Sequence, residues 1–122
     1  MSLVLDAGAL IAVERGDELI RALVEGALRR DDPVVVPATV LAQVWRGGPQ
    51  PRVSRVLRAG AEVSALDEPA ARAVGALLGL SGTSDVVDAH VTLLARKHKA
   101  VIVTSDPDDL RRLDPSATLH TI

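Results

Sequence analysis

The sequence of 122 residues contains no cysteine, and Trp45 is its only aromatic residue, because phenylalanine and tyrosine are both absent. Without cysteine the chain can form neither disulfides nor thiolate metal sites, and a reducing compartment suits it. Without further aromatic side chains it cannot bind single-stranded nucleic acid by stacking bases on an aromatic platform. The hydrophobic core must therefore consist of valine, leucine, isoleucine and alanine.

Long apolar runs are missing as well. No stretch approaches the ~18 apolar residues of a membrane span, and the N-terminus lacks the basic and apolar segments of a signal peptide. We therefore expect a cytoplasmic protein with no membrane partner. With 48% hydrophobic and 25% charged residues, a chain of this length is typical of one folded domain, so we expect a single domain over residues 1–122.

Negative charge is absent from one long segment. The formal net charge is −2, but residues 33–61 contain no aspartate and no glutamate. The arginines of this segment are Arg46, Arg52, Arg55 and Arg58. A local basic patch can bind the phosphate backbone of a nucleic acid, although charge alone equally allows a solvated helix face or a surface for an acidic partner protein.

Apolar runs alternate with segments of helical periodicity along the whole chain. Strands are expected near residues 3–5, 33–37, 61–66, 100–104 and 117–122. Helices are expected from about residue 7 and at 17–30, 38–46, 52–59, 67–79, 84–98 and 106–113. Because the apolar runs lack two-fold alternation, they predict an α/β fold whose parallel sheet is covered by helices on both faces.

Three aspartates are placed where they can meet at one edge of this sheet. Asp6 ends the first strand, Asp106 follows the strand at 100–104, and Asp88 lies near the start of the preceding helix. Ligands bind at the carboxyl edge of such sheets, although an aspartate at a helix start is also a good cap, and each acid taken alone fits either role. Carboxylates ~4 Å apart repel by about 4 kcal/mol at a dielectric near 20. A cluster of three is tolerable when a hard cation such as Mg²⁺ or Mn²⁺ binds in it.

Helical geometry separates Asp88 from its neighbour Asp85. At about 100° per residue, Asp88 lies beside the apolar stripe of the helix at 84–98, and Asp85 is rotated roughly 60° further out. We therefore predict that Asp88 faces the site and that Asp85 caps the helix or faces solvent. Asp108 and Asp109 are interpreted as charges of a first helical turn. None of the three histidines falls in a zinc-binding pattern, and all are expected in the core or in solvent.

Four segments in this order resemble the motifs of a PIN domain: LVLDAGALIA, VVPATVLAQVWRGG, SDVVDAHVTLLA and VTSDPDDL. More narrowly, the chain is similar over its whole length to VapC-type toxin ribonucleases of type II toxin–antitoxin systems. The resemblance implies a three-layer PIN-like fold, with a central parallel sheet of about five strands flanked by helices. It further implies an endoribonuclease that hydrolyses RNA phosphodiester bonds with Mg²⁺ or Mn²⁺, a homodimer, and a cognate antitoxin that inhibits it.

The resemblance also implies roles for individual residues. Asp6, Asp88 and Asp106 match the catalytic, metal-binding acids of the family. Asp109 matches the aspartate of its C-terminal motif, with Thr104 as the nearby hydroxyl, and both join Asp85 as auxiliary candidates. The four arginines of residues 33–61 would contact RNA or the antitoxin.

One position departs from the family pattern. The family usually has a glutamate on the helix after the second strand, where this chain has Gln43. An amide oxygen can still bind a metal or hold a metal-bound water, but one negative charge is lost. Gln43 therefore predicts weaker metal binding, or a site that the substrate phosphate completes.

Three alternatives to a toxin nuclease follow from the same sequence. Gln43 favours a catalytically impaired PIN-like domain that acts as an RNA- or protein-binding module. A phosphoacceptor receiver domain would need an aspartate that closes the third strand and a lysine after a later strand. Here the strand at 61–66 closes without an acid in place before Asp67, and Lys97 and Lys99 precede the strand at 100–104. A dinucleotide-binding fold would need a GxGxxG loop where this chain has DAGAL.

Overall fold

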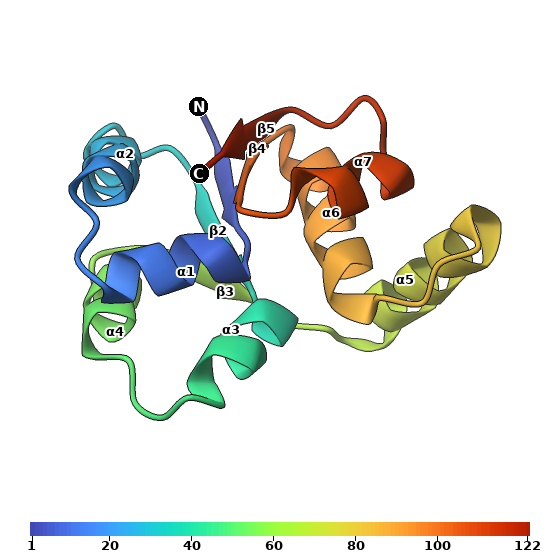
Figure 1. Ribbon diagram of the computed structural model, residues 1–122, viewed down its shortest axis with the longest axis horizontal. Helices are drawn as coiled ribbons and strands as arrows, with labels where there is room; N and C mark the ends of the chain where they lie inside the picture. The colour runs from blue at the N-terminus through green and yellow to red at the C-terminus, as the bar shows by residue number, and fades with distance from the viewer.

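Five strands and seven helices alternate in the computed structural model, which describes residues 1–122 (Figure 1). The strands are β1 (Leu3–Leu5), β2 (Val34–Pro37), β3 (Glu62–Ser64), β4 (Val101–Thr104) and β5 (Leu119–Thr121). The helices are α1 (Ala7–Glu14), α2 (Glu18–Arg29), α3 (Ala38–Trp45), α4 (Pro51–Arg58), α5 (Glu68–Ser81), α6 (Val86–His98) and α7 (Pro107–Leu113). Each expected element is present, with boundaries that shift by a few residues.

The strands form one parallel sheet in the order β3-β2-β1-β4-β5. The chain winds outward from β1 through β2 to β3, and then returns to the other side of β1 to form β4 and β5. The winding therefore reverses between β1 and β4, where Leu5 is in register with Val103. This is the place where ligands bind in open α/β sheets.

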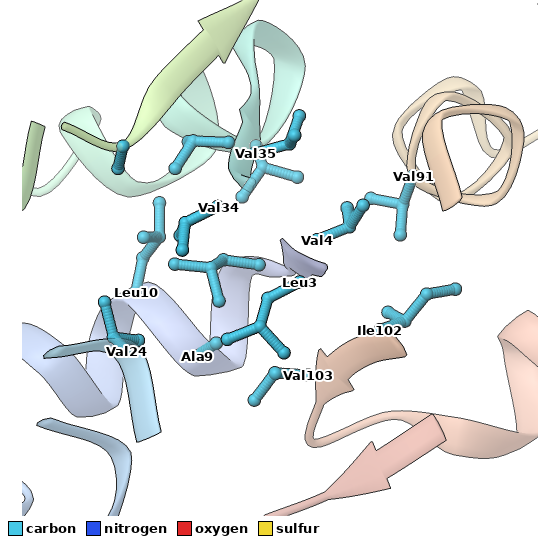
Figure 2. Packing of buried hydrophobic residues seen from close by; sticks show 14 of the residues in the cluster. Leu3, Val4, Ala9, Leu10, Val24, Val34, Val35, Val91, Ile102 and Val103 are labelled. Atoms are coloured by element: carbon cyan, nitrogen blue, oxygen red, sulfur yellow. The ribbon is translucent and has the colours of Figure 1, made fainter. Parts of the chain in front are cut away.

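The apolar runs of β1 and β2 lie in the centre of the molecule, and Leu3, Val4 and Leu5 are fully buried. Figure 2 shows Val4 on the side of the sheet where Val91 of α6 packs, with Leu10 of α1 on the opposite side. Helices α1, α2 and α4 thus form one outer layer, and α5, α6 and α7 form the other (Figure 1). The three-layer α/β fold with a five-stranded parallel sheet is confirmed.

A small second core fixes the helices near the carboxyl edge of the sheet. Val74 of α5, Ala89 of α6 and Leu113 of α7 are buried against one another. The start of α6 is thereby held next to α7, which follows β4. None of the helices is long and apolar enough to cross a bilayer.

Two of the shifted helix boundaries have a local cause. Helix α6 begins at Val86 rather than at residue 84, because Asp85 occupies the N-cap position and its side chain accepts a hydrogen bond from the helix. Helix α5 extends beyond the expected residue 79 to Ser81. Gly82 follows as its C-cap and ends the helix by adopting a left-handed conformation with φ of 69°.

Candidate functional site

The carboxyl ends of β1 and β4 are joined by hydrogen bonds through Thr104. Oδ2 of Asp6 accepts a hydrogen bond from the hydroxyl of Thr104 at 2.9 Å. The same hydroxyl accepts a hydrogen bond from the backbone N–H of Asp106, also at 2.9 Å. The two aspartates expected at this edge therefore lie beside the same buried hydroxyl group.

Asp6 is a buried carboxylate at the end of the central strand, and only 6% of its surface is exposed. Burial raises the pKa of Asp6 above its ordinary value. Hydrogen bonds from Ala7 N–H and Thr104 oppose this shift, while the negative charges of Asp106 and Asp85 add to it. Asp6 thus lies in an environment where negative charge is insufficiently compensated.

Asp106 occupies the N-cap position of α7 without capping it, because its side chain accepts no hydrogen bond from the helix. Capping alone therefore does not explain the aspartate at this position. Its exposed carboxylate remains available for a ligand at the edge of the sheet.

Asp85 and Asp88 have different roles at the start of α6. Oδ1 of Asp85 accepts a hydrogen bond from the N–H of Asp88 at 2.9 Å, so Asp85 caps the helix as the sequence predicts. The half-buried Asp88 has its pKa raised to about 7, chiefly by burial. Four nearby acids add to this shift: Asp85, Asp6, Asp109 and Asp106. Negative charge is therefore concentrated between α6, β1 and α7.

The acids do not converge on one point, however. No three histidine, aspartate or glutamate side chains lie close enough together to hold a metal ion between them. Mg²⁺ commonly binds proteins through only one or two carboxylates and retains several waters. The carboxylate oxygens of Asp6, Asp88 and Asp106 are the donors that such a hard cation prefers, and the raised pKa values of Asp6 and Asp88 agree with a site where positive charge would be stabilising.

A hollow of about 250 Å³ opens between the start of α6 and α7. Its lining residues are Thr83, Ser84, Asp85, Asp88, Asp109, Arg112 and Leu113. The role of Arg112 was not predicted from the sequence. The only signal was its three-residue spacing from Asp109, which is equally typical of an ordinary surface ion pair on a helix.

Gln43 lies exposed on α3, and no hydrogen bond joins it to any of the acids. One helical turn earlier, the hydroxyl of Thr39 is 2.8 Å from Nδ1 of His90, which is buried in α6. This hydrogen bond ties α3, and with it Gln43, to the helix that carries Asp88. The sequence predicts a core or solvated histidine at position 90 but does not predict this contact.

The arginine-rich helix α4 packs on α1, and both lie on the other side of the sheet from α6 (Figure 1). The carboxylate of Glu14 accepts hydrogen bonds from the N–H groups at the start of α4, and the Arg52 guanidinium donates to the Glu14 carbonyl at 2.7 Å. Arg52 and Arg55 line a separate hollow of about 280 Å³ with Glu18 and Glu25 among its lining residues. The basic segment is thus not part of the hollow between α6 and α7 that Asp85, Asp88 and Asp109 line (the acidic hollow).

Comparison with known proteins agrees with this architecture. Residues 3–115 match the family model of the PIN domain. A comparison with curated proteins gives no match.

Several solved structures have the same fold. VapBC2 from Rickettsia felis, solved bound to a DNA fragment from its promoter, is 16% identical and covers 100% of this chain and 99% of its own, with a TM-score of 0.70. FitAcB from Neisseria gonorrhoeae is 18% identical over 98% of this chain and 96% of its own, with a TM-score of 0.65. PAE2754 from Pyrobaculum aerophilum is 18% identical over 98% of this chain and 92% of its own, with a TM-score of 0.64.

Proposed function

The chain belongs to the PIN domain family, and from that premise we propose that it is a VapC-type toxin that hydrolyses RNA with a divalent metal ion. PIN domains are generally nucleases, which agrees with the gathering of carboxylates at the edge of the sheet. The observation that carries the proposal is the position of Asp6, Asp106 and Asp88 around the point where the winding of the sheet reverses. We propose the whole of residues 1–122 as one such domain.

Asp6, Asp88 and Asp106 would hold Mg²⁺ or Mn²⁺. When bound, the ion lowers the pKa of a water molecule and screens negative charge on the phosphate. The chain itself fixes the acids: Thr104 orients Asp6 through its hydroxyl group, and Asp85 holds the first turn of α6. Gln43 and Asp109 are assigned auxiliary roles.

A cognate antitoxin and a second copy of the chain are the proposed protein partners, and cellular RNA in the cytoplasm is the proposed substrate. Structures of VapBC2 and FitAcB share the fold, which supports the assignment to this kind of system. Arg46, Arg52, Arg55 and Arg58 lie outside the acidic hollow and are assigned to contacts with the antitoxin or with RNA away from the cleaved bond.

The test is cleavage of RNA by the purified protein in Mg²⁺ or Mn²⁺, compared with the Asp6→Asn variant. We expect cleavage by the wild-type protein and its loss in Asp6→Asn. Asp108→Asn is the matched control, because this aspartate is exposed on α7 and is not among the acids that act on Asp6 or Asp88. Cleavage that survives Asp6→Asn would contradict the proposal.

Gln43 and the separation of the acids favour one second function, an impaired PIN domain that binds RNA or a protein without cleaving RNA. It predicts RNA binding by the wild-type chain with no cleavage in either metal. Metal-dependent cleavage that Asp6→Asn abolishes would exclude it.

A further inference from the structure

Arg112 is the only basic side chain that lines the acidic hollow between α6 and α7. The other charged residues of the lining are Asp85, Asp88 and Asp109. A surface of this composition repels the phosphate backbone of RNA. Of the three proposed metal ligands only Asp88 lines this hollow. RNA that reaches Asp88 through the hollow therefore needs fixed positive charge in addition to a metal ion, and Arg112 is placed to supply it.

Helix α7 carries two arginine–aspartate pairs of the same spacing, but only one belongs to the hollow. Nη1 of Arg112 lies 3.6 Å from Oδ1 of Asp109, and Nη1 of Arg111 lies 3.5 Å from Oδ1 of Asp108. The Asp109 side chain is 50% exposed and the Asp108 side chain 89% exposed. Arg111 and Asp108 do not line the hollow, so they form a natural control pair.

The pair between Arg112 and Asp109 is loose. Its 3.6 Å separation is longer than a hydrogen bond, and the Arg112 side chain is 73% exposed. Exposed pairs of this kind contribute little to stability, so the guanidinium can turn toward another anion at small cost. A guanidinium binds phosphate through two parallel N–H donors, and the hydroxyl groups of Thr83 and Ser84 offer further donors in the same hollow.

We propose that Arg112 binds a phosphate group of the RNA backbone at the acidic hollow and positions the strand against Asp88. This assignment rests on the proposed action on RNA. In the free protein Arg112 pairs with Asp109, and in the complex the phosphate takes the place of that carboxylate. Arg111 makes no such contact, because it lies outside the hollow.

The experiment measures binding of a fluorescently labelled single-stranded RNA by anisotropy in Mg²⁺, in the Asp6→Asn background, where the RNA is not cleaved. Arg112→Gln is expected to weaken binding by on the order of tenfold, since it removes a charged contact to phosphate. Arg111→Gln removes the same charge from the same helix and is expected to change affinity less than about twofold. Arg112→Lys keeps the positive charge but lacks the planar pair of N–H donors, so its RNA affinity should lie between those of the two glutamine variants.

The salt dependence of binding gives a second measurement. Losing one phosphate contact lowers the slope of log affinity against log salt by about one, and this is expected for Arg112→Gln and not for Arg111→Gln. In the wild-type background, kcat/KM for RNA cleavage should fall in Arg112→Gln and stay unchanged in Arg111→Gln. Thermal unfolding of each variant checks that it is folded.

The outcomes separate this assignment from the proposed function. Equal affinities and equal salt slopes for Arg112→Gln and Arg111→Gln would overturn the role of Arg112, even if the wild-type chain cleaves RNA. A wild-type chain that binds RNA through Arg112 without cleaving it would support the assignment and overturn the nuclease. A chain that binds no RNA would overturn both.

Discussion

Thr104 and Asp6 are joined by a hydrogen bond between neighbouring strands, from the threonine hydroxyl to Oδ2 of the carboxylate at 2.9 Å. The contact follows from the register of the sheet, in which Leu5 pairs with Val103, so that the next residues on each strand lie side by side. A carboxylate held by paired strands is more precisely oriented than one on a loop. The register of β1 and β4 thereby orients one of the proposed metal ligands.

Replacing Thr104 with valine is expected to remove this support at nearly constant volume. Oδ2 of Asp6 and the N–H of Asp106 would both lose their partner, at a cost of about 1–3 kcal/mol of unfolding free energy for a buried polar group left unpaired. RNA cleavage should fall as well. Thr104→Ser keeps the hydroxyl and is expected to retain most of both properties. Denaturant unfolding and a cleavage assay compare the two variants. A Thr104→Val variant as stable as Thr104→Ser would contradict the expectation.

The raised pKa of Asp88 predicts how stability depends on pH without metal. The unfolded chain releases this proton near the ordinary pKa of 3.8, whereas the folded protein keeps it until the pKa of about 7. The folded state therefore binds more protons between these values, and its stability falls as the pH rises through this window. Asp88→Asn, which cannot ionise, should raise the unfolding temperature at pH 8 and raise it clearly less at pH 5, where only part of this stability has been lost.

Thermal unfolding in a chelating buffer at both pH values checks this expectation for Asp88. Asp108→Asn is the control, because Asp108 is exposed on α7 and outside the group of acids that act on Asp88. An Asp88→Asn variant whose gain is the same at pH 5 and pH 8 would show that ionisation of Asp88 does not oppose folding.

Sequence patterns predicted the parts of the site that depend on strand ends. The apolar runs at residues 3–5 and 100–104 placed Asp6 and Asp106 at one edge, because parallel neighbours end on the same side of a sheet. Arg112 was not predicted, since its role depends on how α7 packs beside α6, which the small core around Leu113 determines. Periodicity within one helix gives the buried face but does not name the neighbour that covers it.

The arginine-rich segment illustrates the same limit. Its charge was evident from the sequence, but its place in the molecule depends on long-range contacts to Glu14, thirty-eight positions before Arg52. The contact between Thr39 and His90, fifty-one positions apart, was likewise not predictable from local pattern. Both contacts join different helices, so they cannot be inferred from the spacing of residues within either helix.

Gln43→Glu is expected to strengthen metal binding by restoring the acid that the family usually has on α3. A carboxylate adds a charged oxygen ligand where an amide offers a neutral one, and hard cations prefer the charged ligand. Isothermal titration with Mn²⁺ should show tighter binding in Gln43→Glu than in the wild-type protein, with RNA cleavage equal or higher. Gln50→Glu adds the same charge just before α4, and it should change neither the Mn²⁺ affinity nor RNA cleavage. A Gln43→Glu variant with unchanged Mn²⁺ affinity would show that α3 does not contribute to the metal site.

Gly8 is expected to be essential for the fit between α1 and the segment that leads to Asp106. A Cβ atom at Gly8 would lie 2.8 Å from Cβ and 3.1 Å from the backbone N of Ser105, and closer still to its hydroxyl. Gly8→Ala therefore forces backbone movement beside the site, which we expect to cost about 1–3 kcal/mol of unfolding free energy and to reduce RNA cleavage. Denaturant unfolding and the cleavage assay measure both effects.

Gly75 supplies the matched control for Gly8, because it lies inside α5 with nothing within 4 Å of an added Cβ. Gly75→Ala should raise the unfolding free energy by about 0.5–1 kcal/mol, through the higher helix propensity of alanine, and leave cleavage unchanged. Adding Ser105→Gly to Gly8→Ala removes the clashing side chain and should restore part of both losses. Because the backbone N of Ser105 would still lie 3.1 Å from the new Cβ, full recovery is not expected. A Gly8→Ala variant as stable and active as Gly75→Ala would show that α1 can move away from Ser105 without disturbing the carboxylates.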